Sequence, residues 1–389
     1  EGRASPLPEE TPVRPRTWFR LLALFAALGL FFAACSTEDD SSPSDDTSEE
    51  DEQESSGPAT CQGTPGEDPA LEPVGGGEGD GSGLKIGMVL DIGGVDDDSF
   101  NEAAHAGLVA AEEDFGAEVR YVEPNEDGSN RGELLRQLAQ EDYDLVIGVG
   151  FLFAESMGPL ADEFTDVNFA IIDDSSLTQS NVTPLIFAEE QGSFLVGAAA
   201  ALASGTGQIG FIGGVNTELI NKFEAGFAAG VAQIDEDAEV DARYITEPPD
   251  FAGFADPASA RTMADDMFDS EIDVVYHAAG GSGGGLFEAA VDADRLAIGV
   301  DSDQYQQVDE ATQPCILTSM LKRVDVAVYT AIENLVNDEL TGGTPLVFDL
   351  ENDGVGFATD GGQLADFEDE LNDLRQQIID GDIEVPTTP

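Results

Sequence analysis

Three aspartates in this sequence directly follow short apolar runs. They are Asp91, Asp173 and Asp301, and they lie in both halves of the chain. In an α/β fold such runs are strands, and ligands bind beyond the carboxyl ends of parallel strands. A carboxylate there can accept hydrogen bonds from vicinal hydroxyls or from ring N–H groups. Taken singly, each aspartate is explained equally well by a helix-capping or surface role.

Other residues suited to holding a small molecule occur near these aspartates or in comparable loops. Phe100 and Asn101 begin a helical pattern shortly after Asp91. The glycine-rich loop around Gly280 lets backbone groups approach an uncharged, hydroxyl-rich ligand, although a tight strand-to-helix turn explains it too. Lys322 is one of only three lysines, and it can balance Asp301, donate to a ligand, or form a salt bridge at a helix start.

Several kinds of chemistry are not expected from this sequence. His105 and His277 are the only histidines, so they cannot form a zinc site with the cysteines present, and no Gly-x-Ser-x-Gly motif occurs. The glycine loop lacks a following Gly-Lys-Ser/Thr and has Leu286 where a dinucleotide fingerprint needs its last glycine. We therefore expect no catalytic residues, no metal and no cofactor, and a protein that is not an enzyme.

The elements that position these residues alternate between strand and helix, which predicts parallel sheets with right-handed crossovers. Two comparable sets of such units occur in succession, and together with later segments they predict a hinged, two-lobed α/β protein with its ligand cleft between the lobes. The expected bounds are 84–187 with 302–338 for the first lobe, 188–301 with 339–365 for the second, and 366–389 for a C-terminal helix and tail.

The charge of the chain is extreme, with 15 basic residues against 80 acidic ones, while 41% of its residues are apolar. A halophilic adaptation explains this composition, because a carboxylate-rich surface stays soluble in concentrated salt. The alternative is an acidic surface made for a basic partner. Nucleic acid is excluded as a partner because it requires basic patches. Because acidic residues are so frequent in this chain, a cluster of them does not by itself indicate a binding site. We therefore interpret Asp96–Asp98 as solvated surface.

The amino-terminal region has the pattern of an export signal. Arginines precede the apolar run Leu21–Ala34, which is too short to span a bilayer, and Phe32–Cys35 resembles a lipobox. We interpret residues 1–35 as a signal peptide with lipidation at Cys35; an ordinary signal with an unrelated cysteine is the alternative. Residues 36–83 read as an acidic, disordered tether. If Cys35 is lipidated, Cys61 and Cys315 are left over and can pair.

Six segments, in order, resemble the basic membrane protein family, the nucleoside-binding lipoproteins of ABC-type importers with a type I periplasmic-binding-protein fold. The resemblance covers about Lys85 to Asp360. Its segments are Asp91–Asn101, Phe211–Gly214, Lys222–Phe227, Tyr276–Gly281, Gly299–Gln304 and Thr318–Asp325.

The resemblance implies a purine nucleoside held between two lobes. The base would stack on Phe100 and on Phe254, which lies in the segment Phe251–Asp256. Asp91, Asn101 and Asp173 would address the base and its edge, whereas the backbone near Gly280, with Asp301 and Lys322, would hold the ribose hydroxyls. The match is loosest around Phe254 and Asp173.

The expected function is therefore that of a lipid-anchored substrate-binding protein on the extracellular face of the cell membrane. Its partners would be a nucleoside and the permease and ATPase subunits of an ABC transporter, and we expect a monomer. The alternatives are a binding protein for a sugar or another small solute, a surface receptor or adhesin without a transport role, and a nucleoside hydrolase. The hydrolase would need a calcium-binding acid cluster, and Asp96–Asp98 superficially resembles one.

Overall fold

Short, mostly apolar runs form the inner strands of two separate sheets. A computed structural model describes residues 57–64 and 74–389. The inner strands are buried on both faces because helices cover both faces of each sheet, as is usual for parallel sheets, whereas one edge strand of each sheet carries charged, partly exposed side chains. Across the first sheet the order is β11 (Leu346–Phe348), β5 (Val182–Phe187), β4 (Asn168–Ile172), β3 (Leu145–Gly148), β1 (Lys85–Val89) and β2 (Glu118–Val122).

The second sheet has the same arrangement as the first, with one antiparallel edge strand. All its pairs are parallel except that between its last strand in sequence and the neighbouring strand. Its order is β12 (Val355–Phe357), β10 (Ile316–Lys322), β9 (Leu296–Asp301), β8 (Val274–Ala278), β6 (Gln208–Val215) and β7 (Glu239–Thr246). The expected type I periplasmic-binding-protein fold, a two-lobed α/β protein, is confirmed.

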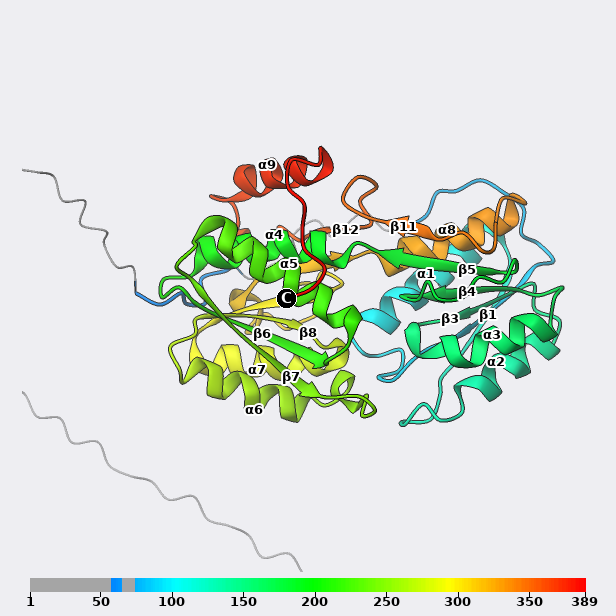
Figure 1. Cartoon of the computed structure of the whole chain (residues 1–389), viewed down its shortest axis with the longest axis horizontal. Coiled ribbons are helices and arrows are strands. Elements are labelled where there is room, and N and C mark those ends of the chain that lie inside the picture. The colour runs from blue at the N-terminus through cyan, green and yellow to red at the C-terminus, as the bar shows by residue number, and fades with distance from the viewer. Residues whose placement is uncertain (1–56, 65–73) are drawn as a thin grey trace, which may run out of the picture. The chain divides into compact units, whose positions relative to one another are not determined.

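The helices pack in pairs on the faces of these sheets (Figure 1). In the first lobe one pair is α1 (Phe100–Phe115) with α8 (Val324–Val336), and the other is α2 (Arg131–Gln140) with α3 (Ala154–Glu163). The second lobe pairs α4 (Glu189–Ala203) with α5 (Glu218–Ile234), and α6 (Pro257–Phe268) with α7 (Gly283–Ala293). A last helix, α9 (Glu368–Ile379), contacts α4 and falls within the predicted C-terminal segment.

Small residues let α4 and α5 approach closely, as the Gly- and Ala-rich sequence of α4 predicts. A methyl group built on Gly197 would lie 2.2 Å from the carbonyl oxygen of Phe227, and one on Gly230 would lie 1.9 Å from that of Phe194. Both distances are far below van der Waals contact. Any side chain at either position would therefore force the two helices apart.

The chain crosses between the lobes three times, and the last two crossings differ from the expected bounds. The first crossing, from β5 to α4, lies where we predicted it. However, β10 lies in the second sheet rather than in the first lobe, so that only α8 of the segment 302–338 belongs there. In the segment 339–365, β11 joins the first sheet and only β12 joins the second. Each sheet thus receives its last strand from the carboxyl-terminal segment 339–365.

The described part of the predicted tether, residues 57–64 and 74–83, is not free; we call it the docked segment. Residues 57–64 lie on the second lobe, where Cys61 forms a disulfide with Cys315 and the Ala59 N–H donates to the Asp273 carboxylate at 2.8 Å. Residues 74–83 lie on the first lobe, where the Gly77 N–H donates to the Tyr329 hydroxyl at 2.7 Å. The expectation of a disordered tether is therefore wrong for these residues, because specific partners on both lobes hold them.

The signal peptide and Cys35 lie outside the described residues. Within residues 57–64 and 74–389, no helix is both long enough and apolar enough to cross a membrane.

Candidate functional site

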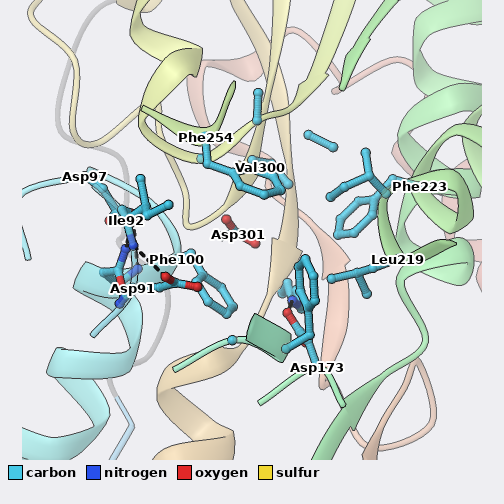
Figure 2. A pocket seen from close by; sticks show the side chains of 18 residues that line it. Asp91, Ile92, Asp97, Phe100, Asp173, Leu219, Phe223, Phe254, Val300 and Asp301 are labelled. Atoms are coloured by element: carbon cyan, nitrogen blue, oxygen red, sulfur yellow. Dashed lines mark hydrogen bonds and ion pairs between the residues drawn. The ribbon is translucent and has the colours of Figure 1, made fainter. Parts of the chain in front are cut away.

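One pocket lies between the lobes and contains every ligand-binding residue predicted from the sequence (Figure 2). The first lobe provides side chains that follow β1 and β4, and the second lobe provides the loops after β8 and β9 and the end of β10. The predicted residues in its lining are Asp91, Phe100, Asn101, Asp173, Phe254, Gly280, Asp301 and Lys322.

Two of the strand-end aspartates have an unusual backbone. Asp173 follows β4 with a φ of 64°, and Asp301 ends β9 with a φ of 65°. This left-handed conformation is sparsely populated by residues other than glycine, and such residues concentrate at functional sites. One aspartate belongs to each lobe, and both line the pocket. Matching local geometry thus brings two carboxylates from distant strands to the same cavity.

Lys322 is the cation at the centre of these carboxylates. Its side chain is only 2% exposed, and its Nζ lies 2.6 Å from Oδ2 of Asp173, whose side chain is 3% exposed. The same Nζ lies 4.7 Å from the ring centre of Phe100 and 4.9 Å from that of Phe187. Lys322 ends β10 of the second sheet, so this ion pair joins the two lobes. A buried cation here offsets the cost of burying several acids.

Burial and mutual charge shift the pKa values in this cluster. Burial raises the pKa of Asp301 to about 6, although Lys322 and the Ser99 hydroxyl act in the opposite direction. Burial also raises the pKa of Glu189, the fully buried first residue of α4, to about 7. For Lys322, burial alone would lower the pKa, but Asp173, Glu189 and Asp301 together raise it. The lysine therefore stays charged, while two of its acids titrate near neutral pH.

The raised pKa of Glu189 predicts how stability changes with pH. The folded protein holds this proton up to about pH 7, whereas the unfolded chain releases it near the ordinary glutamate pKa of 4.5. The contribution of Glu189 to the free energy of unfolding is therefore fully present below pH 4.5 and is lost as the pH rises through about 7. We expect Glu189→Gln to remove this pH-dependent loss of stability. The loss amounts to about 1–2 kcal/mol when relaxation of the protein around the charged carboxylate is allowed for.

The measurement is urea unfolding of both proteins in molar salt at several pH values between about 4.5 and 8. The free energy of unfolding of the wild type, relative to the variant, should decrease across this range. The exposed substitution Glu236→Gln should give a difference that does not depend on pH. A constant difference for Glu189→Gln as well would contradict the prediction.

The loop after β1 is held by a network around Asp97 and Asn101. The Asp97 carboxylate accepts hydrogen bonds from the N–H groups of Ser99, Asn101 and Glu102, at 3.0–3.1 Å, and so caps α1. The Asn101 amide donates to Asp97 at 2.8 Å and accepts the Asp91 N–H at 2.7 Å. The interpretation of Asp96–Asp98 as solvated surface is therefore wrong for Asp97, which is buried because it satisfies the free N–H groups of a helix start.

Aromatic rings form the apolar walls of the pocket. Phe100 belongs to the first lobe, and Phe223 and Phe254 belong to the second (Figure 2). At the cleft, Phe151 of the first lobe also meets Phe251 of the second, with ring centres 6.1 Å apart. Rings on both sides of a narrow cleft suit a flat ligand that can stack between them.

Polar contacts across the cleft show that the lobes are closed. The Ser99 hydroxyl donates to Asp301 Oδ2 at 2.5 Å, and the Gln304 side chain donates to the Asp98 carbonyl at 2.9 Å. Closer to the surface, the Gln307 amide donates to Glu102 at 2.8 Å. Each bond joins residues at the start of α1 to the last residue of β9 or to the segment that follows it. Opening the cleft would break all of them.

Several residues important to this site were not identified from the sequence. Ser99 and Phe223 lie within two of the six segments that resemble the family but were not assigned to the site, and Glu189 lies in none of them. Arg131 could have been noticed, because the whole chain has only 15 basic residues. His277, the histidine of the glycine-rich loop, lies buried in β8 with Nε2 2.9 Å from the Gln304 amide oxygen, and burial lowers its pKa to about 4.

The described residues contain no group of three His, Cys, Asp or Glu side chains that could hold a metal ion.

Comparisons with known proteins agree on one family. A family described as Bmp, ABC transporter substrate-binding protein PnrA-like, matches residues 84–389. The chain is 33% identical to a CD4+ T-cell-stimulating antigen of Listeria monocytogenes, over 78% of this chain and 88% of the relative. It is also 33% identical to the ABC transporter nucleoside-binding protein BmpA of Lactococcus lactis, over 78% of this chain and 89% of the relative. Among solved structures, an ABC transporter solute-binding protein of Aeropyrum pernix is 26% identical, with a TM-score of 0.69 over 78% of this chain and 93% of that one.

Proposed function

Because the chain belongs to the Bmp family of PnrA-like ABC transporter substrate-binding proteins, we propose that it binds a purine nucleoside between its lobes and delivers it to a membrane permease. The permease and its ATPase are separate chains. The protein is anchored by a lipid at Cys35 on the extracellular face of the membrane and acts as a monomer. Its cycle consists of binding, closure and release, without a chemical step.

The observation that carries the proposal is that aromatic rings from both lobes, buried carboxylates and a lysine line a single cleft. Stacking between rings contributes about 1–3 kcal/mol per base and accepts any base. Selectivity then depends on hydrogen bonds in a desolvated site, where an unmatched polar group costs about 1–3 kcal/mol. Phe100 and Phe254 provide the stacking, and Asp173, Asp301 and Lys322 face the ligand's hydroxyl and N–H groups. The Asn101 amide is already engaged within its own loop, so its role is to brace Asp91.

The proposal predicts that Phe100→Ala and Asp301→Ala each weaken the binding of guanosine, inosine or adenosine by at least about tenfold. The first loses a stacking surface, and the second loses a buried acceptor that also contacts Ser99. Calorimetry in molar salt measures both effects. Asp96→Ala is the matched control, because Asp96 is exposed and does not line the pocket. Unchanged affinities in the two site variants would reject this site.

A thermal-shift screen of nucleosides and sugars in molar salt tests the ligand class directly. A ligand that binds only the folded state raises the melting temperature by an amount that grows with the logarithm of its concentration relative to its dissociation constant. We expect purine nucleosides to raise it and simple sugars to leave it unchanged. Stabilisation by sugars alone would favour the sugar-binding alternative.

A further inference from the structure

Among the described residues that line the pocket, Arg131 forms hydrogen bonds with Asp91 alone. Its Nε donates to Asp91 Oδ1 at 2.8 Å, and a second guanidinium nitrogen contacts the same oxygen. The Ile92 N–H donates to that oxygen as well, at 2.8 Å. Arg131 itself is not among the residues that line the pocket, and its side chain is 12% exposed.

The surroundings of Arg131 fix it in place. Its guanidinium carbon lies 5.8 Å from the ring centre of Phe153, and its remaining nitrogen donates to the Gly128 carbonyl at 3.2 Å. A side chain at Gly128 would overlap the guanidinium, since a methyl group built there lies 2.1 Å from it. The loop before α2 is therefore shaped around this arginine, unlike an arginine that pairs loosely at the surface.

The other oxygen of Asp91 remains available to a ligand. Among the described residues none donates a hydrogen bond to Oδ2, which lies beside Gly150 at the pocket wall, 2.9 Å from where a methyl group on that glycine would be. The Asp91 backbone is fixed in turn by Asn101, which accepts its N–H at 2.7 Å. One carboxylate oxygen is thus saturated by protein donors, and the other faces the cavity.

We propose that Arg131 is a positioning residue that keeps Asp91 ionised and turns its Oδ2 into the cleft as a hydrogen-bond acceptor. An ionised carboxylate can only accept hydrogen bonds. This end of the pocket therefore selects ligands that present an N–H or O–H group to Asp91, such as the N1–H of guanosine or inosine. The inference rests on the proposed nucleoside-binding function and names the residue that sets selectivity within it.

The electrostatics support the need for such a residue. Burial raises the pKa of Asp91, and Arg131 opposes that shift by its charge and its hydrogen bonds. Without the guanidinium, Asp91 would hold its proton to higher pH and would present a donor where the ligand also presents one. The other titratable groups that line the pocket are Asp97, Asp173, Asp301 and Lys322, and Asp127 interacts with Arg131 from the preceding loop.

The test is guanosine binding by Arg131→Met, measured by calorimetry in molar salt between about pH 5.5 and 8.5. We expect the ratio of the variant's dissociation constant to that of the wild type to be at least about tenfold at the low end and to fall severalfold as the pH rises. Asp301 is present in both proteins, so the effect of its titration on binding cancels in this ratio of dissociation constants. Arg131→Lys, which keeps the charge but loses the planar fork, should recover part of the affinity.

Arg136→Met is the matched control. Arg136 lies on the same helix, pairs with Glu163 at 2.7 Å and also lies over a phenylalanine ring, but its side chain is 42% exposed and does not line the pocket. It should leave guanosine affinity unchanged at every pH.

A double-mutant cycle separates positioning from a general effect on folding. In the Asp91→Asn background, Arg131→Met should weaken guanosine binding by less than about twofold, because the group it acts through is already neutral. A loss that is independent of pH, or additive with Asp91→Asn, would overturn the inference. If the wild type binds guanosine and Arg131→Met binds it equally well, the inference alone fails. If the wild type binds no nucleoside, the proposed function fails first and the inference fails with it.

Discussion

Replacing Lys322 with methionine is expected to abolish the proposed nucleoside binding and to lower the free energy of unfolding by about 3–5 kcal/mol. Removing one member of a buried ion pair leaves its partner charged and without compensation. Here Asp173, Glu189 and Asp301 all interact with the lost cation. Methionine has nearly the volume of lysine, so packing against Phe100 and Phe187 is retained. The measured changes in stability and binding are then due to the loss of the positive charge.

The measurements for Lys322→Met are urea unfolding and calorimetric titration with guanosine, both in molar salt. The stability loss should be smaller near pH 5 than near pH 8, because the acids of the cluster become protonated and need no counter-charge. Lys85→Met is the control, since Lys85 forms no salt bridge with any residue in the described part of the chain. Guanosine binding of wild-type strength by Lys322→Met would contradict this view of the site.

Much of the site could be predicted because its residues occupy positions that parallel-sheet topology constrains. Asp173 and Asp301 follow apolar runs in different halves of the chain, and the carboxyl ends of strands in two lobes face one cleft. Lys322 stood out because this composition has almost eliminated lysine. Each of these arguments uses a local signal whose spatial meaning is fixed by the fold, and this is why all the predicted ligand-binding residues line the pocket.

Some strands and the lobe boundaries could not be predicted, because they depend on contacts between residues far apart in the sequence. The strand β5 contains Pro184, and β10 contains Thr318 and Ser319, so neither has the uninterrupted apolar run expected of a buried strand. The hydroxyl of Ser319 instead accepts the Gln304 N–H at 3.1 Å, and that of Thr318 donates to the Ala358 carbonyl at 2.6 Å. Because β10 was not recognised as a strand, the lobe boundaries predicted beyond residue 301 were wrong.

Acidic composition also misled the interpretation of individual acids. In a chain with 80 acidic residues, Asp97 looks like one more solvated carboxylate, yet it is buried against the first turn of α1. Asp273 is a similar case, for its buried carboxylate accepts N–H groups from Ala59 and from Gly205. A buried acid is recognisable only from the N–H groups that converge on it, and these come from segments far apart in sequence.

The docked segment joins the two lobes outside the three crossings of the fold. Its part on the second lobe is held covalently by Cys61, by the Gly63 N–H on the Pro314 carbonyl at 3.1 Å, and by the Ala59 contact to Asp273. Its part on the first lobe is held by the Gly77 contact to Tyr329 and by the Gly81 N–H on the Phe115 carbonyl at 2.8 Å. The disulfide is therefore the strongest attachment of a segment with few apolar side chains of its own.

The double substitution Cys61→Ala with Cys315→Ala is accordingly expected to lower the free energy of unfolding by about 2–5 kcal/mol. The two cysteines are 254 residues apart, so the bond constrains a long stretch of the unfolded chain. Guanosine affinity should change by less than about twofold, because neither cysteine lines the pocket. Urea unfolding with and without reductant measures the first effect: reductant should destabilise the wild type to the level of the double variant and leave the double variant unchanged. If the disulfide instead governed closure of the cleft, the double variant would lose affinity as well as stability, and the docked segment would have to be assigned a part in ligand binding.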